Sequence, residues 1–295
     1  MMRTWCIAML VGVSTGCVGA PVVVEPDPAP ATPPSAQAPV PAPRLTVGGQ
    51  AMQGGILRGT ALGGILTLDG RPVAVAADGA FLIAFDRDAG PAALLLLTSP
   101  DGTRMERPIS VAPRDWPIER VDAPYRAGKT DAEFAALRPG ELAQIVAARA
   151  MVTDAKGWRQ DLHWPAAGRL SGRFGAQRVY QGKPGSYHGG ADVAVPTGTV
   201  VTAPADGVVI LAAARPFTLE GHLLMLDHGA GLNSALLHLS RIDVAVGQRV
   251  RQGQPIGLSG ATGRATGPHL HWSLQWQGAK LDPLLIAGSP PPVAR

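Results

Sequence analysis

Glycine and proline interrupt this chain at short intervals, and few folds tolerate so many of them. The sequence holds 37 glycines and 28 prolines among 295 residues. Proline lacks the N–H that a helix needs, and glycine in a helix costs backbone entropy. The composition therefore excludes a helical bundle and predicts strands, turns and at least one extended segment. Because 46% of the residues are apolar, a packed core is still expected.

The N-terminus has the pattern of an export signal. A single arginine precedes an apolar stretch over residues 5–13, and small residues follow it. The small residue directly before Cys17 resembles a bacterial lipobox, so residues 1–16 are predicted to be a signal peptide and Cys17 to carry lipid. Ser14 departs from the aliphatic residue usual at its position, and cleavage near Ala20 is the alternative. Both cysteines lie within the first 17 residues, so neither a disulfide framework nor a cysteine metal site is expected.

Residues 17–43 are predicted to be a tether. Nine prolines fall within residues 21–43, interleaved with alanine and valine. Such a segment makes neither helices nor strand ladders and stays extended. Together with the signal, it places the folded part of the chain outside the cytoplasm, in the cell envelope or periplasm, with lipid anchoring to the outer membrane.

Two β-rich regions separated by a helix follow the tether. Residues 44–115 alternate short apolar runs with Asp-Gly pairs at 69–70, 78–79 and 101–102, which predicts hairpins and a small β-sandwich. A connecting segment, 116–158, has apolar residues at helical spacing over 139–153, with Pro139 in the first turn. Strand and turn patterns return over 159–288, predicted as an all-β domain, and 289–295 is a tail. The expected fold class is mainly β.

The chemistry-bearing residues gather in that last β domain. His269 and His271 flank Leu270, and the following residues alternate between apolar and polar. On a strand, this alternation places both imidazoles on one face and the apolar side chains on the other. One imidazole can then bind a metal while its neighbour contacts the metal's water; two surface histidines are the plainer interpretation.

Two further sites supply complementary groups. His188 and Asp192 are separated by three residues, two of them glycines that disfavour a helix, so a loop brings them together. Two imidazoles and a carboxylate are suitable ligands for a catalytic zinc ion, so His188, Asp192 and one of the paired histidines form a candidate set. His238 lies in an otherwise apolar strand and is the natural fourth imidazole of a metal cleft.

At this point the sequence resembles a known family. The segments HGGADVAVPTGTVVTAPADGVV, LLHLS and GATGRATGPHLHW are similar to those of the LytM/lysostaphin-like zinc endopeptidases of bacterial cell walls (peptidase family M23), over about residues 169–286. The resemblance implies zinc ligation by His188, Asp192 and His271, with His238 and His269 as the catalytic pair. It also implies an antiparallel β domain with a long cleft.

The same resemblance implies the substrate. Peptidoglycan peptide cross-links are expected, and the inferred compartment points to the bond between D-alanine and meso-diaminopimelate. Family members often carry a tyrosine where this chain has Leu236; its absence implies lower activity or a transfer of its oxyanion role to a histidine. The alternative function is a non-catalytic or autoinhibited regulator that activates a cell-wall amidase.

Two other classes of partner are excluded. The formal net charge of +4 is too small for a nucleic-acid-binding protein of this length. The glycine-rich segment 257–267 lacks the Gly-Lys-Ser/Thr ending and the glycine spacing of nucleotide-binding loops.

Overall fold

Strands dominate the part of the chain that the computed structural model describes, residues 42–122 and 132–292. This confirms the mainly β fold class. The predicted signal peptide, Cys17 and almost all of the predicted tether lie outside the described residues. No helix in the described ranges combines the length and hydropathy needed to cross a bilayer.

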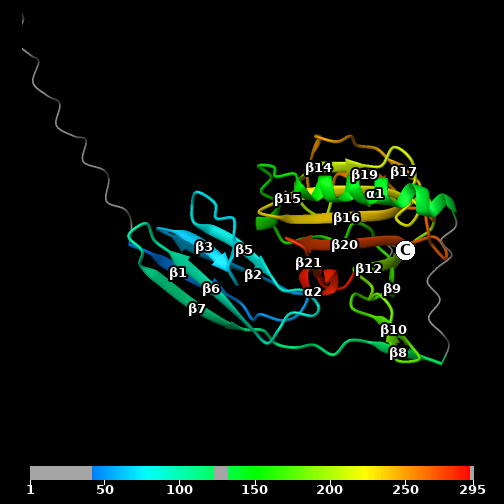
Figure 1. Ribbon diagram of the computed structural model, residues 1–295. Helices are drawn as coiled ribbons and strands as arrows, with labels where there is room; N and C mark the ends of the chain where they lie inside the picture. Colours follow the sequence, from blue (N-terminus) through cyan, green and yellow to red (C-terminus); the bar gives the residue numbers. More distant parts are fainter. Residues whose placement is uncertain (1–41, 123–131, 293–295) are drawn as a thin grey trace, which may run out of the picture. The chain divides into compact units, whose positions relative to one another are not determined.

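Two antiparallel sheets form the N-terminal module, as the sandwich prediction required (Figure 1). The Asp69-Gly70 hairpin has left-handed φ at both residues, whereas at 78–79 and 101–102 only the glycine does. No strand forms over 73–75, where Val75 makes one isolated bridge. One sheet contains β1 (Arg44–Gly48), β2 (Ile56–Leu62) and β5 (Ala80–Ala84); the other contains β4 (Arg71–Pro72), β3 (Ile65–Leu68), β6 (Ala92–Thr98) and β7 (Arg104–Ser110).

The connecting helix differs from its prediction. Helix α1 (Ala132–Ala150) begins seven residues before Pro139, so the proline lies inside the helix. The buried positions are Glu141, Ile145 and Ala148, while Leu142 and Val146 are exposed. The apolar spacing predicts a helix, as observed, but Leu142 and Val146 face solvent. Fewer residues of the helix contact the sheet than the apolar pattern suggested.

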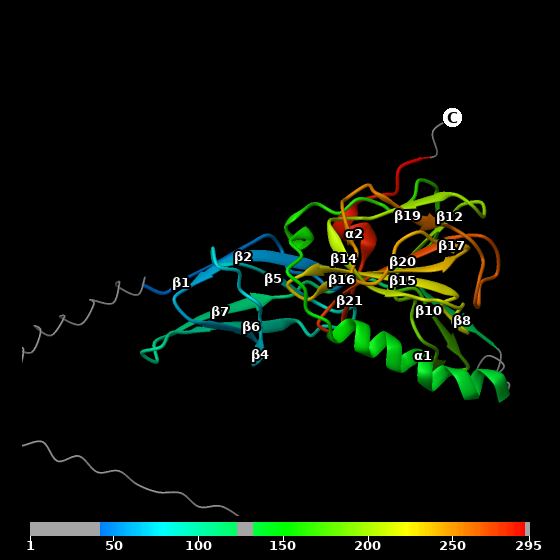
Figure 2. The same cartoon turned by 90° about the horizontal axis from the view of Figure 1, so that it is seen from above.

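A large antiparallel sheet forms the centre of the C-terminal domain, in the order β18-β14-β15-β16-β20-β12-β9, with β21 beside β20 (Figure 1). Ile145 and Ala148 of α1 pack on one face of it, against side chains of β14 and β15 that include Leu211, Leu223 and Met225; Figure 2 shows α1 lying along this sheet. The strands are β9 (Arg169–Gly172), β12 (Ala191–Ala194), β14 (Gly207–Ala212), β15 (His222–Gly229), β16 (Leu232–Leu239), β18 (Arg249–Val250), β20 (Leu270–Trp276) and β21 (Ala279–Leu281).

Two small sheets flank the large one. The connecting segment contributes β8 (Ile118–Val121), which pairs in parallel with β10 (Gln177–Tyr180), and β10 pairs with β11 (Lys183–Pro184). The other small sheet contains β13 (Val200–Thr202), β19 (Pro255–Leu258) and β17 (Arg241–Ile242). The domain predicted as all-β also holds a short helix, α2 (Pro283–Ala287), capped by the Asp282 carboxylate, and a 3₁₀ turn over Gly157–Arg159 precedes its first strand.

Candidate metal centre

Three neighbouring strands bring the predicted site residues together. β12 and β20 are antiparallel, and their register places Asp192 directly opposite His271. β16 lies on the other side of β20, where Leu237 is opposite His271, so His238 follows at the end of the strand. Strand pairing thus joins residues that lie about 30 to 80 positions apart in the sequence.

The predicted alternation along β20 is confirmed. Leu270, Trp272, Leu274 and Trp276 are buried, and His271, Ser273 and Gln275 are half-buried on the opposite face. The apolar side chains anchor the strand in the core. His271 is therefore held on a rigid strand rather than on a loop.

Three side-chain atoms converge at the end of this arrangement. Asp192 Oδ1 lies 2.8 Å from His271 Nδ1 and 3.2 Å from His188 Nε2, and the two ring nitrogens are 3.1 Å apart. A tetrahedral zinc site with bonds of about 2.1 Å has ligand–ligand edges of roughly 3.4 Å. The observed distances are close to these edges, so the three residues fit a zinc ion.

The orientation of His188 supports the same conclusion. Its Nδ1 lies 3.0 Å from the Arg173 carbonyl oxygen, which can only accept, so Nδ1 carries the proton. In the neutral ring, Nε2 then carries a lone pair that points toward the Asp192 carboxylate. A carbonyl that fixes the tautomer of a ligand in this way is typical of metal-binding histidines.

The electrostatics of the three residues favour a positive charge between them. Burial opposes protonation of His188, but the hydrogen bond and charge of Asp192 outweigh it and raise the pKa of the imidazole. Burial would raise the pKa of Asp192, yet the neighbouring His188 and His271, in their protonated forms, hold it far below its usual range. Burial lowers the pKa of His271. An ionised Asp192 beside neutral imidazoles is the state that binds a metal cation.

His238 and His269 form a second pair beside this cluster, with ring centroids 4.7 Å apart. His238 Nδ1 donates to the Thr262 carbonyl at 2.9 Å, and His269 Nδ1 donates to the Gly267 carbonyl at 2.8 Å. Both rings therefore keep a lone pair on Nε2 when neutral. Burial lowers the pKa of His238, which keeps that lone pair available near neutral pH.

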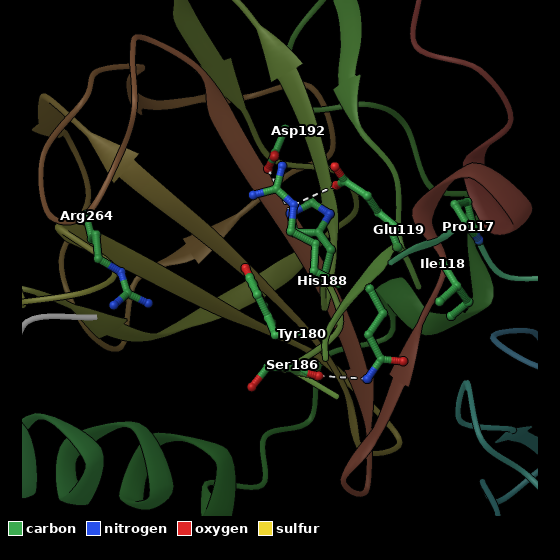
Figure 3. Close-up of a pocket in the computed structure, with 12 residues that line it drawn as sticks. Pro117, Ile118, Glu119, Tyr180, Ser186, His188, Asp192 and Arg264 are labelled. Atoms are coloured by element: carbon green, nitrogen blue, oxygen red, sulfur yellow. Dashed lines mark hydrogen bonds and ion pairs between the residues drawn. The ribbon is translucent and has the colours of Figure 1, made fainter. Parts of the chain in front are cut away.

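Two cavities adjoin the cluster and share His188, Asp192 and Arg264 among their lining residues. The smaller, of about 330 Å³, contains His238, His269 and His271. The larger, of about 1060 Å³, is shown in Figure 3; its far wall is formed by Pro117, Ile118 and Glu119 of the connecting segment. The two cavities, together called the groove below, thus border the cluster of His188, Asp192 and His271, called the metal cluster below.

Residues with no local sequence signal support this site. Tyr187, next to His188, donates a hydrogen bond to Asp86 at 3.2 Å, and Arg87 donates to the Gly175 carbonyl at 3.1 Å. The Gly175 N–H in turn donates to the His188 carbonyl. The N-terminal module therefore fixes the loop that carries His188.

Helix α1 supports the other end of the site. Arg138 makes two hydrogen bonds to Glu220, at 2.6 and 2.8 Å, and a third to Glu141 at 3.1 Å. The Glu220 carbonyl accepts the His238 N–H, and His238 has a left-handed φ of 63°. No local sequence signal could reveal this contact, because Arg138 and Glu220 lie 82 positions apart.

The remaining residues singled out from the sequence lie apart from the metal cluster. Leu236 is fully buried in the core and offers no polar atom to the cavity. His228 is buried on β15, and its Nδ1 lies 2.9 Å from the Asp206 carbonyl oxygen. His222 contacts the Ala213 carbonyl, and His163 is exposed.

Comparisons with known proteins agree with this geometry. The model of peptidase family M23 matches residues 186–283. Peptidoglycan DD-endopeptidase ShyA of Vibrio cholerae is 42% identical over 115 residues, which cover 39% of this chain and 26% of that protein. DD-carboxypeptidase/endopeptidase Mpg of Neisseria meningitidis is 40% identical over 100 residues, which cover 34% of this chain and 23% of that protein. The chain thus spans about a quarter of the length of these two relatives.

A solved structure extends the likeness beyond the matched segment. A putative peptidase M23 from Pseudomonas aeruginosa superposes with a TM-score of 0.64 at 29% identity, covering 81% of this chain and 96% of that one. The resemblance inferred from the sequence is confirmed: the chain contains a domain of peptidase family M23.

Proposed function

We propose that the chain is a zinc-dependent endopeptidase that cleaves peptide cross-links of bacterial peptidoglycan. One observation carries the proposal: Asp192 Oδ1, His188 Nε2 and His271 Nδ1 converge within 3.2 Å of one another, and His238 and His269 line the same cavity. Family membership supports a peptidase. The names of the relatives in Vibrio and Neisseria support peptidoglycan as the substrate.

The position of each residue in the site determines its proposed role. His188, Asp192 and His271 would hold the zinc ion. Its chemistry is Lewis acidity, which polarises the carbonyl under attack and lowers the pKa of water. Among the described residues, Glu220 is the only glutamate that lines the smaller cavity, and it is ion-paired to Arg138, so proton transfer falls to histidines. One Nε2 of the His238–His269 pair takes a proton from the attacking water, and the other, on a ring that is protonated at both nitrogens, donates to the oxyanion or the leaving amine.

The proposal extends to the bond and the location. For an exported lipoprotein of the Gram-negative type, the bond is that between D-alanine and meso-diaminopimelate. Lipid at Cys17 and the proline-rich tether would hold the enzyme at the outer membrane, with the folded domains reaching the cell wall. These statements rest on the N-terminal sequence and the resemblance.

A digest of purified peptidoglycan sacculi tests the activity. The mature protein without its lipid is incubated with sacculi, with and without chelator, and the fragments are read by chromatography and mass spectrometry. Conversion of cross-linked dimers to monomers that stops with chelator and returns with zinc is expected. An unchanged profile with zinc bound would contradict the proposal and favour the amidase-activating regulator.

A further inference from the structure

One charged side chain beside the metal cluster has no partner. Arg264 is exposed, lines both cavities, and makes no side-chain hydrogen bond or ion pair within residues 42–122 and 132–292. The other charged groups in the lining are satisfied. Glu119 pairs with Arg178 at 2.7 Å, and Glu220 pairs with Arg138. Asp192 belongs to the metal cluster.

The loop that carries Arg264 is held firmly. The Arg264 N–H donates to the Leu219 carbonyl at 3.0 Å. A Cβ at Gly263 would overlap the backbone of Gly221, and a Cβ at Gly221 would overlap Thr262. Thr262 donates through its hydroxyl to the Leu239 carbonyl at 2.7 Å, and its own carbonyl orients His238.

Arg264 is therefore positioned together with the candidate catalytic group. One residue, Gly263, separates it from Thr262, whose carbonyl fixes the His238 ring, and both Thr262 and Gly263 are packed against the 219–221 segment. In Figure 3, the Arg264 side chain stands across the pocket from Glu119, Pro117 and Ile118, with His188 and Asp192 between the two sides. A guanidinium held there faces whatever occupies the groove beside the reacting bond.

We infer that Arg264 binds the substrate carboxylate next to the scissile amide, and so selects cross-links that carry a free acid at this point. The inference rests on the proposed endopeptidase function. In the D-alanine–diaminopimelate cross-link, the carbon that bears the scissile nitrogen also bears a carboxylate. A planar guanidinium pairs with a carboxylate through two parallel hydrogen bonds, which fixes orientation as well as charge.

The size of the effect follows from the chemistry of the pair. Hydrogen bonds between charged groups contribute about 1.5–3 kcal/mol, which corresponds to roughly 10- to 150-fold in kcat/KM. Exposure of Arg264 to solvent places the expected loss toward the lower end, about 10- to 30-fold.

The test compares two purified cross-linked dimers that differ in one group: the carboxylate beside the scissile bond is free in one and amidated in the other. Wild-type protein is expected to prefer the free acid at least tenfold in kcat/KM. Arg264→Gln should lose this preference, cleaving the free acid as slowly as the amide. Arg264→Lys should recover part of it. Arg251→Gln, which removes the same charge beside β18, should keep the wild-type preference.

Three results would overturn the inference. These are equal cleavage of both dimers by wild-type protein, an equal slowing of both by Arg264→Gln, and a preference that follows the terminal carboxylate of the peptide instead. The first of them leaves the proposed function intact.

A binding measurement separates the two proposals if no cleavage is seen. The peptide that carries the released amine, with its neighbouring carboxylate free or amidated, is titrated into zinc-loaded protein by calorimetry. Tighter binding of the free acid that disappears in Arg264→Gln supports the carboxylate site even when the endopeptidase proposal fails. Equal affinities refute the site.

Discussion

Removing the guanidinium of Arg138 should weaken the fold and the site together. The side chains of Arg138 and Glu220 are each 15% exposed, and that of Glu141 is 8% exposed. Arg138→Met keeps the length of the side chain but leaves two carboxylates facing each other without a cation. Glu141 keeps its bonds to the N–H and hydroxyl of Thr218, whereas Glu220 loses both of its hydrogen bonds from Arg138.

The loss of folding stability can be estimated from these lost hydrogen bonds. Breaking a buried ion pair by removing one partner typically costs about 3–5 kcal/mol, because the remaining charge is uncompensated. For a protein of this size, each kcal/mol lowers Tm by about 2–4 °C. We therefore expect Arg138→Met to lower Tm in calorimetry by roughly 10 °C. Because the Glu220 carbonyl holds the His238 N–H, turnover should also fall while zinc content stays unchanged.

A second variant separates lost charge compensation from lost packing. In Arg138→Met/Glu220→Gln, one of the stranded carboxylates becomes a neutral amide, so at least half of the lost stability should return. If Arg138→Met lowered Tm by less than about 2 °C, the reasoning would be refuted. A double variant no more stable than the single one would also refute it.

Three shorter predictions concern the metal and the membrane. His188→Ala should lose zinc, whereas His238→Ala should keep zinc and lose turnover; metal analysis of the purified variants decides, and zinc loss from the His238 variant would make it a ligand. Gly190→Ala should weaken zinc binding in chelator competition, because a Cβ there would lie 2.7 Å from His271 Nε2; an unchanged affinity would contradict this. Cys17→Ala should release the protein from the membrane fraction, and continued sedimentation with membranes would exclude the lipid anchor.

Short local patterns in the sequence indicate how several of the candidate site residues are placed. The alternation after Leu270 predicts which side chains lie on each face of β20. The short spacing of His188 and Asp192 indicates that a loop joins them. In the structure, Asp192 itself lies on β12. Each pattern is a few residues long, so periodicity and residue chemistry suffice to interpret it.

The supporting contacts could not be predicted in this way. Arg87 and Gly175 are 88 positions apart, and nothing in either neighbourhood marks the other as a partner. The glycine-rich 257–267 segment lacks the pattern of a phosphate-binding loop. Its use of main-chain carbonyls to hold His238 and His269 depends on tertiary packing. The start of α1 was also missed, because a proline inside a helix looks like a helix start when neighbouring contacts are unknown.

The pairing of β8 with β10 has a consequence for how this chain can be divided. Residues 118–121 come from before α1, yet they add a strand beside the groove, and Ile118 and Glu119 form part of its wall. A fragment cut at the limits of the family match, 186–283, would retain all five candidate site residues but lose that wall, α1, and the Arg87 support for the His188 loop. Exchange of that fragment between proteins would thus carry the five candidate site residues without the groove wall and supporting contacts, and the smallest portable form includes the N-terminal module, β8 and α1.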